Sequence, residues 1–480
     1  MRSRRRLAPL ALLCAAFLIA GCGARLSPKQ RALAIQAGGA GSGVATQTTQ
    51  GPTATGPGTT GSGTATGGTA GTKGTAGSKG TTTTTGGAGP KGATCSATAS
   101  NNGGKTDVGV TATSINLANI SDISGPVPGL FKSAREASQA YVNYFNATYP
   151  QGICGRKLVL DTYDSRTNST SNGSATKQAC GKDFAITGSQ SAFDDGGASA
   201  VNQCKDVDIP AAAVTAQRQA SPYTHAALST DVHHISDVTP KFVESEKNSA
   251  AFLYIDAGAS SQNGAHDIQA YQKVWGTKFA YTAAIPIQNA TTQGFGPYVQ
   301  QMKSKHVTFV QWLGAYQEAA SLAQAMDQAS FYPKYLLMDP TAYNSAYLQQ
   351  AGAAADKVHS YVYSPAAPLD ANIAEVQLYK SWLQRSGISS EPTFFGQCSW
   401  SAMQLFVEMA FKVGPHLTRA AMNAQLKKVD NWTDNDMTSK QHVGSKLTGE
   451  GALFLKSQSG KWIKTAPPGD GYIYGKLVAT

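Results

Sequence analysis

The sequence predicts an α/β protein in which helices flank parallel sheets and the ordered part of the chain forms two domains. Three observations support this prediction. Short apolar strands alternate with amphipathic helices in two successive series, a pattern typical of parallel sheets covered by helices. About 370 residues carry the pattern, which is more than one hydrophobic core usually holds. The residues before them are nearly all small or polar, as in a disordered tether.

The N-terminus has the features of an export signal. Arginines at positions 2 and 4–6 precede an apolar stretch, Leu7–Ala20, that is too short to span a bilayer. Gly21 and Cys22 complete a resemblance to a bacterial lipobox, which implies a signal peptide over residues 1–21 and lipidation of Cys22. An ordinary signal peptide with an incidental cysteine is the alternative. The arginines also resemble a twin-arginine signal.

Residues 22–105 are predicted to be a lipidated N-terminus followed by a disordered linker. From Ala37 to Thr94 the chain is nearly all Gly, Thr, Ala and Ser, without aromatic or acidic residues. Such a segment buries too little apolar surface to offset its conformational entropy. As a flexible coil of about 58 residues it reaches roughly 40 Å, which suits a tether between a membrane anchor and a folded domain.

The formal net charge of +11 arises almost entirely from the N-terminal residues. Ten lysines and arginines and no acidic residue fall within residues 1–94, so subtracting these ten leaves about +1 on residues 95–480. A near-neutral folded part does not favour a nucleic-acid partner, because such partners need a broad cationic surface.

Five of the seven cysteines remain after the signal peptide removes Cys14 and lipid occupies Cys22: Cys95, Cys154, Cys180, Cys204 and Cys398. Export permits disulfides, and an odd number leaves at least one thiol unpaired. We expect a disulfide between Cys180 and Cys204, which fall on consecutive helices that should cover one face of the first sheet, although spacing does not fix connectivity. No pair has the CxxC spacing of a zinc or redox site.

The first series of elements lies between residues 114 and 214. It comprises strand 114–120, helix 131–147, strand 157–163, helix 171–182, strand 184–188, helix 193–206 and strand 209–214. Alternation of apolar and polar residues marks the first strand, and helical spacing of Ala, Tyr and Phe marks the first helix. A turn containing Gly152 and Gly155 precedes the next strand.

The second series follows a predicted crossover at 229–237. It comprises strand 250–256, helix 263–275, strand 278–284, helix 295–305, strand 307–313, helix 317–329 and strand 334–338. The remaining elements are strand 358–363 and helices 371–386, 398–413 and 417–427. Residues 451–462 are predicted to form a β-hairpin that turns at Ser459-Gly460.

Six stretches follow one another along this pattern: SDISGPVPG (121–129), GICGRKLVLDTYDS (152–165), AAFLYIDAGASSQNG (250–264), GFGPYVQQMKSKHVTFVQWLG (294–314), KYLLMDPTAYNSAYLQQAG (334–352) and GKW (460–462). Their order and spacing resemble those of the type I periplasmic binding proteins, the family of the leucine/isoleucine/valine-binding protein. The resemblance covers about residues 106–475. It implies two doubly wound parallel-sheet lobes joined by a hinge, with the ligand in the cleft at the carboxyl ends of the strands. Lobe one would comprise 106–232 and 360–430, and lobe two 233–359 and 431–478.

In lobe one, the resemblance implies ligand contacts in the loops after the third and fourth strands, from Ser191, Thr215, Ala216 and Gln217. The branched-chain amino-acid binders hold the ligand carboxylate there with hydroxyls and backbone N–H groups. Small hydroxyl side chains beside a helix N-terminus suit an anion. Alternatively, Ser191 only caps the helix that starts near Phe193.

In lobe two, the resemblance implies contacts near the ends of successive strands, from Ser260, Ser261, Trp312, Tyr316, Asp339 and Thr341. Trp312 and Tyr316 suit stacking on a ligand, although Trp312 also suits core packing. Thr341 stands where the amino-acid binders place a glutamate for the ligand ammonium, and a threonine cannot pair with it as a carboxylate does. Asp339 lies two residues away, so an amino acid, an amide or an organic acid is compatible.

Motifs of other functional classes are missing from the sequence. It has no GxSxG, HExxH or P-loop motif, so we expect no enzyme. His233-His234 is interpreted as a hydrated hinge pair rather than a metal site. Residues 434–445 lack the glycine and glutamate of a calcium loop. We expect neither a metal nor a cofactor.

The sequence therefore predicts the extracytoplasmic solute-binding lipoprotein of an ABC importer. It would capture a small polar solute between two closing lobes and deliver it to the permease subunits. We expect a monomer held at the outer face of the cell membrane by its lipid anchor. The alternative is a sensor lipoprotein of the same fold that passes its signal to a signalling partner.

Overall fold

The computed structural model describes residues 87–88, 90–469 and 471–480. These residues belong to one compact unit, Thr81–Thr480. The predicted signal peptide, the lipidation site Cys22 and the predicted linker up to residue 86 lie outside the described residues. The prediction of disorder up to residue 105 is wrong at its end, because a disulfide from Cys95 to Cys154 attaches this segment to the folded part. Within the described part of the chain, no helix combines the length and apolar character needed to cross a membrane.

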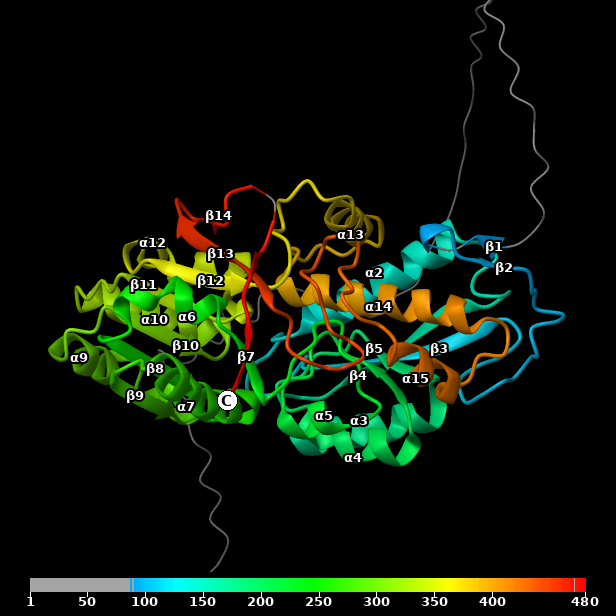
Figure 1. Cartoon of the computed structure of the whole chain (residues 1–480), viewed down its shortest axis with the longest axis horizontal. Helices are drawn as coiled ribbons and strands as arrows, with labels where there is room; N and C mark the ends of the chain where they lie inside the picture. The colour runs from blue at the N-terminus through cyan, green and yellow to red at the C-terminus, as the bar shows by residue number, and fades with distance from the viewer. Residues whose placement is uncertain (1–86, 89, 470) are drawn as a thin grey trace, which may run out of the picture. The chain divides into compact units, whose positions relative to one another are not determined.

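The first sheet has four parallel strands in the order β4-β3-β5-β6. Strands β3, β4 and β5 are labelled in Figure 1. Their bounds are β3 Ser114–Ser121, β4 Lys157–Asp164, β5 Ala185–Thr187 and β6 Val207–Ile209. Along β3, Ile115 and Leu117 pack in one apolar cluster, whereas Ala118 and Ile120 pack in another. Because strand side chains alternate between the two faces, both faces of this sheet are buried, as a doubly wound fold requires.

Two groups of helices provide these coverings. Those contributing to the cluster around Leu117 are α2 Lys132–Thr148, α13 Ala374–Arg385, α14 Phe394–Val413 and α15 Arg419–Leu426. Those contributing to the cluster around Ile120 are α3 Ser169–Lys182 and α4 Asp195–Cys204. The short helix α5 Ala216–Ala220 follows β6. This sheet and its helices are called lobe one below.

The second sheet has the strand order β14-β13-β12-β11-β10-β8-β9, with β15 paired to β13. Its strands are β8 Ala250–Ile255, β9 Phe279–Ile285, β10 Phe309–Leu313, β11 Tyr335–Met338, β12 Ser360–Ser364, β13 Gly451–Gln458, β14 Lys461–Ala466 and β15 Ile473–Tyr474. Strands β8 to β12 are parallel to one another, and β13 is antiparallel to β12, β14 and β15. Both faces are again buried, since Val310 and Trp312 pack on one side and Phe309 on the other.

Helix α6, which precedes β8, and the helices between the strands of the second sheet complete lobe two. They are α6 Val238–Phe242, α7 Gly258–Trp275, α8 Ile287–Thr292, α9 Gly296–Ser304, α10 Tyr316–Gln328, α11 Ser345–Ala351 and α12 Ala354–Lys357. Two small sheets remain, β1 Gly87–Ala88 with β2 Thr94–Cys95, and β7 His234–Ser236 with β16 Leu477–Ala479. The predicted α/β fold with two parallel sheets is confirmed.

Several element boundaries differ from the prediction. Strand β6 ends at Ile209 rather than continuing to 214, although the Ala211 N–H beyond Pro210 still donates to the Ser189 carbonyl oxygen at 2.9 Å. Helix α7 begins at Gly258 rather than at 263, so the predicted contact loop is its first turn. The predicted hairpin is present, with Gln458 opposite Lys461 and positive φ at both turn residues, Ser459 and Gly460, as two-residue hairpins favour.

The division of the chain between the sheets also differs from the predicted one. Strand β12 was expected in lobe one, but it pairs with β11 and β13 in the second sheet. Conversely, Trp432, Met437 and Val443 pack in the core of lobe one, although lobe two was expected from 431. After the first crossing near 228–236, strand pairing and core contacts thus place the return to lobe one after Ser364. They place the second crossing to lobe two before Gly451.

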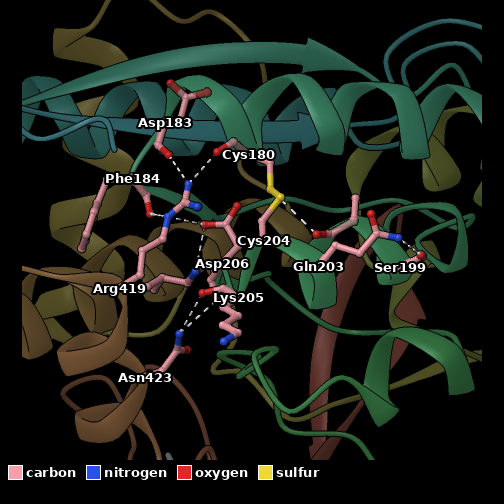
Figure 2. The surroundings of a disulfide bond; sticks show 12 residues. Cys180, Asp183, Phe184, Ser199, Gln203, Cys204, Lys205, Asp206, Arg419 and Asn423 are labelled. Atoms are coloured by element: carbon pink, nitrogen blue, oxygen red, sulfur yellow. Dashed lines mark hydrogen bonds and ion pairs between the residues drawn. A yellow bond between two sulfur atoms is a disulfide. The ribbon is translucent and has the colours of Figure 1, made fainter. Parts of the chain in front are cut away.

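Disulfides join Cys95 to Cys154 and Cys180 to Cys204, while Cys398 is buried and free. Figure 2 shows the second disulfide linking α3 to the end of α4, with the Arg419 guanidinium beside it. Arg419 Nη2 donates to the backbone oxygens of Cys180 at 3.0 Å and Asp183 at 2.6 Å. Helix α15 is therefore fixed to the end of α3 at the same place as the disulfide.

Replacing both Cys180 and Cys204 with alanine is expected to lower the free energy of unfolding by about 3 kcal/mol. The disulfide closes a segment of 24 residues, and cross-linking such a segment removes conformational entropy from the unfolded chain. Urea-induced unfolding of the oxidised protein and the double variant measures the difference. A loss below about 1 kcal/mol would contradict a stabilising cross-link.

Candidate ligand site

A cavity of about 340 Å³ lies between the two lobes. Gln190 lines it three residues beyond the end of β5, Asp339 directly follows β11, and Tyr363 lies near the end of β12. The chain segment 228–236, which crosses between the lobes, forms a further part of the wall. Open α/β sheets bind ligands at the carboxyl ends of their strands, and the volume is within the usual range for small-molecule sites. We call this space the interlobe cavity.

The two lobes touch beside the cavity. The Ala259 N–H in the first turn of α7 donates to the Ala192 carbonyl oxygen at 2.9 Å. The Asn263 side-chain amide donates to the Val214 carbonyl oxygen at 3.1 Å. These bonds join α7 of lobe two to both contact loops of lobe one, so they form only while the lobes are closed.

Replacing Asn263 with alanine is expected to shift the protein towards a more open arrangement of the lobes. One interlobe hydrogen bond contributes about 0.5–1.5 kcal/mol, and its loss weakens only the closed state. Small-angle X-ray scattering of the ligand-free protein measures the change as an increase in the radius of gyration. The control is Gln269→Ala, because Gln269 is exposed on the same helix; an equal change in both variants would contradict a role for the Asn263 contact.

Three of the ten predicted contact residues line the interlobe cavity: Ser260, Asp339 and Thr341. Asp339 is 6 % exposed and accepts hydrogen bonds from the Thr341 N–H at 2.7 Å and the Gly314 N–H at 3.1 Å. Burial raises the pKa of Asp339 above its usual range, although these bonds oppose the shift. The buried carboxyl group of Asp339 thus lines the cavity, at one of the positions that the sequence analysis predicted.

Ser191 does not line the interlobe cavity, because its hydroxyl points to a carboxylate within lobe one. Ser191 Oγ donates to Asp122 Oδ1 at 3.0 Å and accepts from the Phe193 N–H at 3.1 Å. Ser191 does not cap the helix either, because α4 begins at Asp195 with Asp194 as its N-cap residue. Its neighbour Gln190 lines the cavity instead.

Thr215 is likewise turned inward. Its hydroxyl donates to Asp194 Oδ1 at 2.5 Å, and it caps α5 by accepting from the Arg218 N–H at 3.4 Å. Among the residues after it, Gln217 is exposed, and the Ala216 N–H donates to the Gln262 side chain at 3.4 Å. None of these three predicted residues lines the cavity.

The remaining predicted residues lie beside the interlobe cavity or in the core. Ser261 Oγ donates to Asp256 Oδ1 at 2.5 Å. Trp312 is fully buried in the core of lobe two and packs edge-on against Phe295. Tyr316 lines a neighbouring groove of about 330 Å³, which shares Thr341 with the interlobe cavity.

Aromatic side chains form much of the cavity wall, and nothing in the sequence marks them as a group. They are Phe131, Phe252, Tyr271, Tyr363, Phe394 and Phe395. The polar residues of α7 that line the cavity do carry a signal, since Asn263, His266, Asp267 and Tyr271 recur at the spacing of one helix face. Recognising them required knowing that this face of α7 is turned towards the other lobe.

Histidines occur in two pairs with carboxylates at the cavity. His234 Nδ1 lies 2.5 Å from Asp231 Oδ2, and His266 Nδ1 lies 3.2 Å from Asp267 Oδ1. The Asp267 carboxylate raises the pKa of His266. Across the described residues, no group of three or more His, Cys, Asp or Glu side chains is placed to hold a metal ion.

A family model described as periplasmic binding protein matches residues 114–450. The chain belongs to this family. The predicted resemblance to type I periplasmic binding proteins is thereby confirmed. Periplasmic binding proteins act outside the cytoplasm, bind small molecules and work with ABC transporters, so this one is a solute-binding protein rather than an enzyme. No curated protein matches the chain by sequence.

Solved structures share the fold at low sequence identity. The branched-chain amino acid binding protein LivJ from Streptococcus pneumoniae, in complex with isoleucine, is 14 % identical with a TM-score of 0.62, covering 75 % of this periplasmic binding protein and 100 % of LivJ. A fatty acid ABC transporter substrate-binding protein from Thermomonospora curvata is 18 % identical with a TM-score of 0.67, covering 78 % and 96 %. A solute-binding protein from R. palustris, in complex with 4-hydroxybenzoate, is 14 % identical with a TM-score of 0.62, covering 75 % and 97 %. These relationships establish the fold.

Proposed function

We propose that this periplasmic binding protein is the solute-binding lipoprotein of an ABC importer, which captures a small ligand in the interlobe cavity and delivers it to permease subunits. The interlobe cavity is the observation that carries the proposal. It lies at the carboxyl ends of strands from both sheets, so a ligand within it touches both lobes. Such a ligand stabilises the closed arrangement through contacts that an open arrangement lacks. A permease can then distinguish loaded from empty protein by the closed lobes.

The test is thermal unfolding of the purified full-length chain with amino acids, amides, amines, organic acids and aromatic acids. A ligand at about one hundred times its Kd adds roughly 2.7 kcal/mol of stability, which raises the Tm of a large domain by a few degrees. The matched variant is Ser260→Trp, which fills the cavity from the first turn of α7. We expect a shift with one chemical class in the wild-type chain and none in the variant. No shift with any class, or a shift retained by Ser260→Trp, contradicts the proposed site.

Lipidation of Cys22 has a separate test. Cells that express the chain and receive labelled palmitate should yield a labelled protein in the membrane fraction. Cys22→Ala should remove the label and leave the ligand-induced shift unchanged, because the linker separates Cys22 from the folded lobes. Equal labelling of both forms contradicts a lipid anchor at Cys22.

A further inference from the structure

The hydroxyl and backbone donors predicted to hold a ligand carboxylate are occupied by side chains of the protein. Asp122, which directly follows β3, accepts from two donors in the loop after β5. They are Ser191 Oγ at 3.0 Å and the Ala192 N–H at 2.8 Å. Two further donors, Ser165 Oγ and the Thr167 N–H, reach the same carboxylate at 2.5 and 3.1 Å. Asp122 is fully buried, so it is an anion-like ligand built into lobe one.

The loop after β6 repeats this arrangement with another aspartate. Asp194 accepts from the Val214 N–H at 2.8 Å, the Thr215 N–H at 3.1 Å and Thr215 Oγ1 at 2.5 Å. Burial raises the pKa of Asp194 to about 7, while the Arg218 charge opposes the shift. While Asp194 is ionised, these donors have no hydrogen left for a ligand, since each N–H or O–H provides one.

The cavity wall carries acidic and aromatic groups without a free cation. Among the described residues that line it there is no lysine or arginine, and both histidines are paired with carboxylates. Desolvating a ligand carboxylate there would cost free energy that no cationic side chain returns. The N–H group of Ala259 in the first turn of α7 is also used, by the Ala192 carbonyl oxygen.

Groups that can accept a hydrogen bond from a donor or a cation also line the cavity. Asp267 is 30 % exposed, and its Oδ1 meets His266, so Oδ2 faces no described donor. Asp339 and Tyr363 line the same cavity as Asp267, and burial, followed by the charges of these two carboxylates, raises the pKa of Tyr363. Gln311 Oε1 lines the same cavity, buried and without a partner among the described residues.

An apolar wall stands alongside these groups. Phe395 packs edge-on against Phe131 at 4.8 Å between ring centroids and against Phe394 at 5.0 Å. All three line the cavity. Phe131 directly precedes α2, and Phe394 and Phe395 begin α14. Aromatic faces accept apolar bodies, and they also attract cations.

We propose, on the basis of the proposed function, that the interlobe cavity binds amines with an aromatic or branched apolar body and no carboxylate. The ammonium group lies at Asp267 and Asp339, and the apolar body lies against Phe131, Phe394 and Phe395. Asp122 and Asp194 fill the positions of a ligand anion and exclude amino acids and organic acids.

Isothermal titration of the purified full-length chain with four probes that share one body tests this assignment: 2-phenylethylamine, 2-phenylethanol, 3-phenylpropionate and phenylalanine. We expect the amine to bind roughly tenfold or more tightly than the alcohol, and neither carboxylate to bind measurably, because a charge-assisted hydrogen bond contributes about 1.5–3 kcal/mol. Asp267→Asn should weaken the amine by roughly tenfold and leave the alcohol unchanged. The control Asp256→Asn, at an exposed residue outside the cavity wall, should alter neither.

Each other outcome overturns the assignment and reports separately on the proposed function. Tightest binding of phenylalanine or 3-phenylpropionate refutes the amine class but leaves a solute-binding protein. Equal binding of amine and alcohol, or an unchanged amine affinity in both Asp267→Asn and Asp339→Asn, refutes the role of the two carboxyls. Absence of binding by all four probes refutes the amine class, and the broader thermal panel then decides whether the solute-binding function stands.

Discussion

Replacing Arg218 with methionine is expected to lower the free energy of unfolding by about 3–5 kcal/mol. Arg218 Nε and Nη2 donate to the two carboxylate oxygens of Asp208 at 2.7 and 2.8 Å. The two side chains are 4 % and 0 % exposed. Methionine fills a similar volume but leaves Asp208 as a buried charge with one remaining side-chain donor, Thr224 Oγ1 at 2.6 Å. The loss is therefore mainly the cost of an unpaired buried carboxylate.

Urea-induced unfolding of the wild type and the variant measures this loss. Lys357→Met is the matched control, because solvent screens the Lys357–Asp327 pair at the surface and its loss should change stability little. Removing the stranded charge as well, in Arg218→Met with Asp208→Leu, should recover much of the lost stability. Equal losses in the single and double variants would show that packing of the arginine, rather than its charge, is what matters.

Replacing Trp312 with alanine is expected to cost about 3–5 kcal/mol of stability. The indole ring is fully buried in the core of lobe two, where it packs against Phe295 and fills the space beside Gly314. Removing it leaves a cavity that the surrounding sheet and helices cannot close completely. Its Nε1–H has no hydrogen-bond partner among the described residues, so Trp312→Phe should cost much less.

The same substitutions separate core packing from ligand contact at Trp312. Urea-induced unfolding measures stability, with Tyr332→Ala as the control, since Tyr332 is 47 % exposed. Ligand affinity is measured on the stable Trp312→Phe form and should equal that of the wild type, because the ring does not line the interlobe cavity. A large loss of affinity in Trp312→Phe with little change in stability would restore the stacking role that its position at the end of β10 suggested.

Helices, strands and turns were predicted correctly where a short stretch of sequence determines them. Strand β3 formed where apolar and polar residues alternate in the sequence, although both of its faces are covered by helices and residues 117–121 are all buried. The turn at Ser459-Gly460 formed where two small residues separate two apolar strands. The boundary of β6 moved because the apolar residues after Ile209 are buried in a loop, and an apolar run alone does not distinguish a buried loop from a strand.

The candidate site was only partly predictable. The sequence indicated the correct loops and three lining residues, Ser260, Asp339 and Thr341. It did not indicate that Gln190 rather than Ser191 faces the cavity, because a loop lacks the fixed periodicity of a strand or helix. Nor did it associate Phe131 with Phe395, whose rings meet only after α2 and α14 pack together.

The sequence by itself determined the class of fold, the family, and the candidate position at the strand ends where the interlobe cavity lies, because these depend on periodicity and on motifs within short stretches. Only the tertiary structure decided which donors of that site are free. Ser191 is bound by Asp122, 69 residues earlier in the chain, and Thr215 by Asp194, 21 residues earlier. A hydroxyl that suits an anion is equally satisfied by a carboxylate of the protein itself, and folding alone brings that carboxylate within reach.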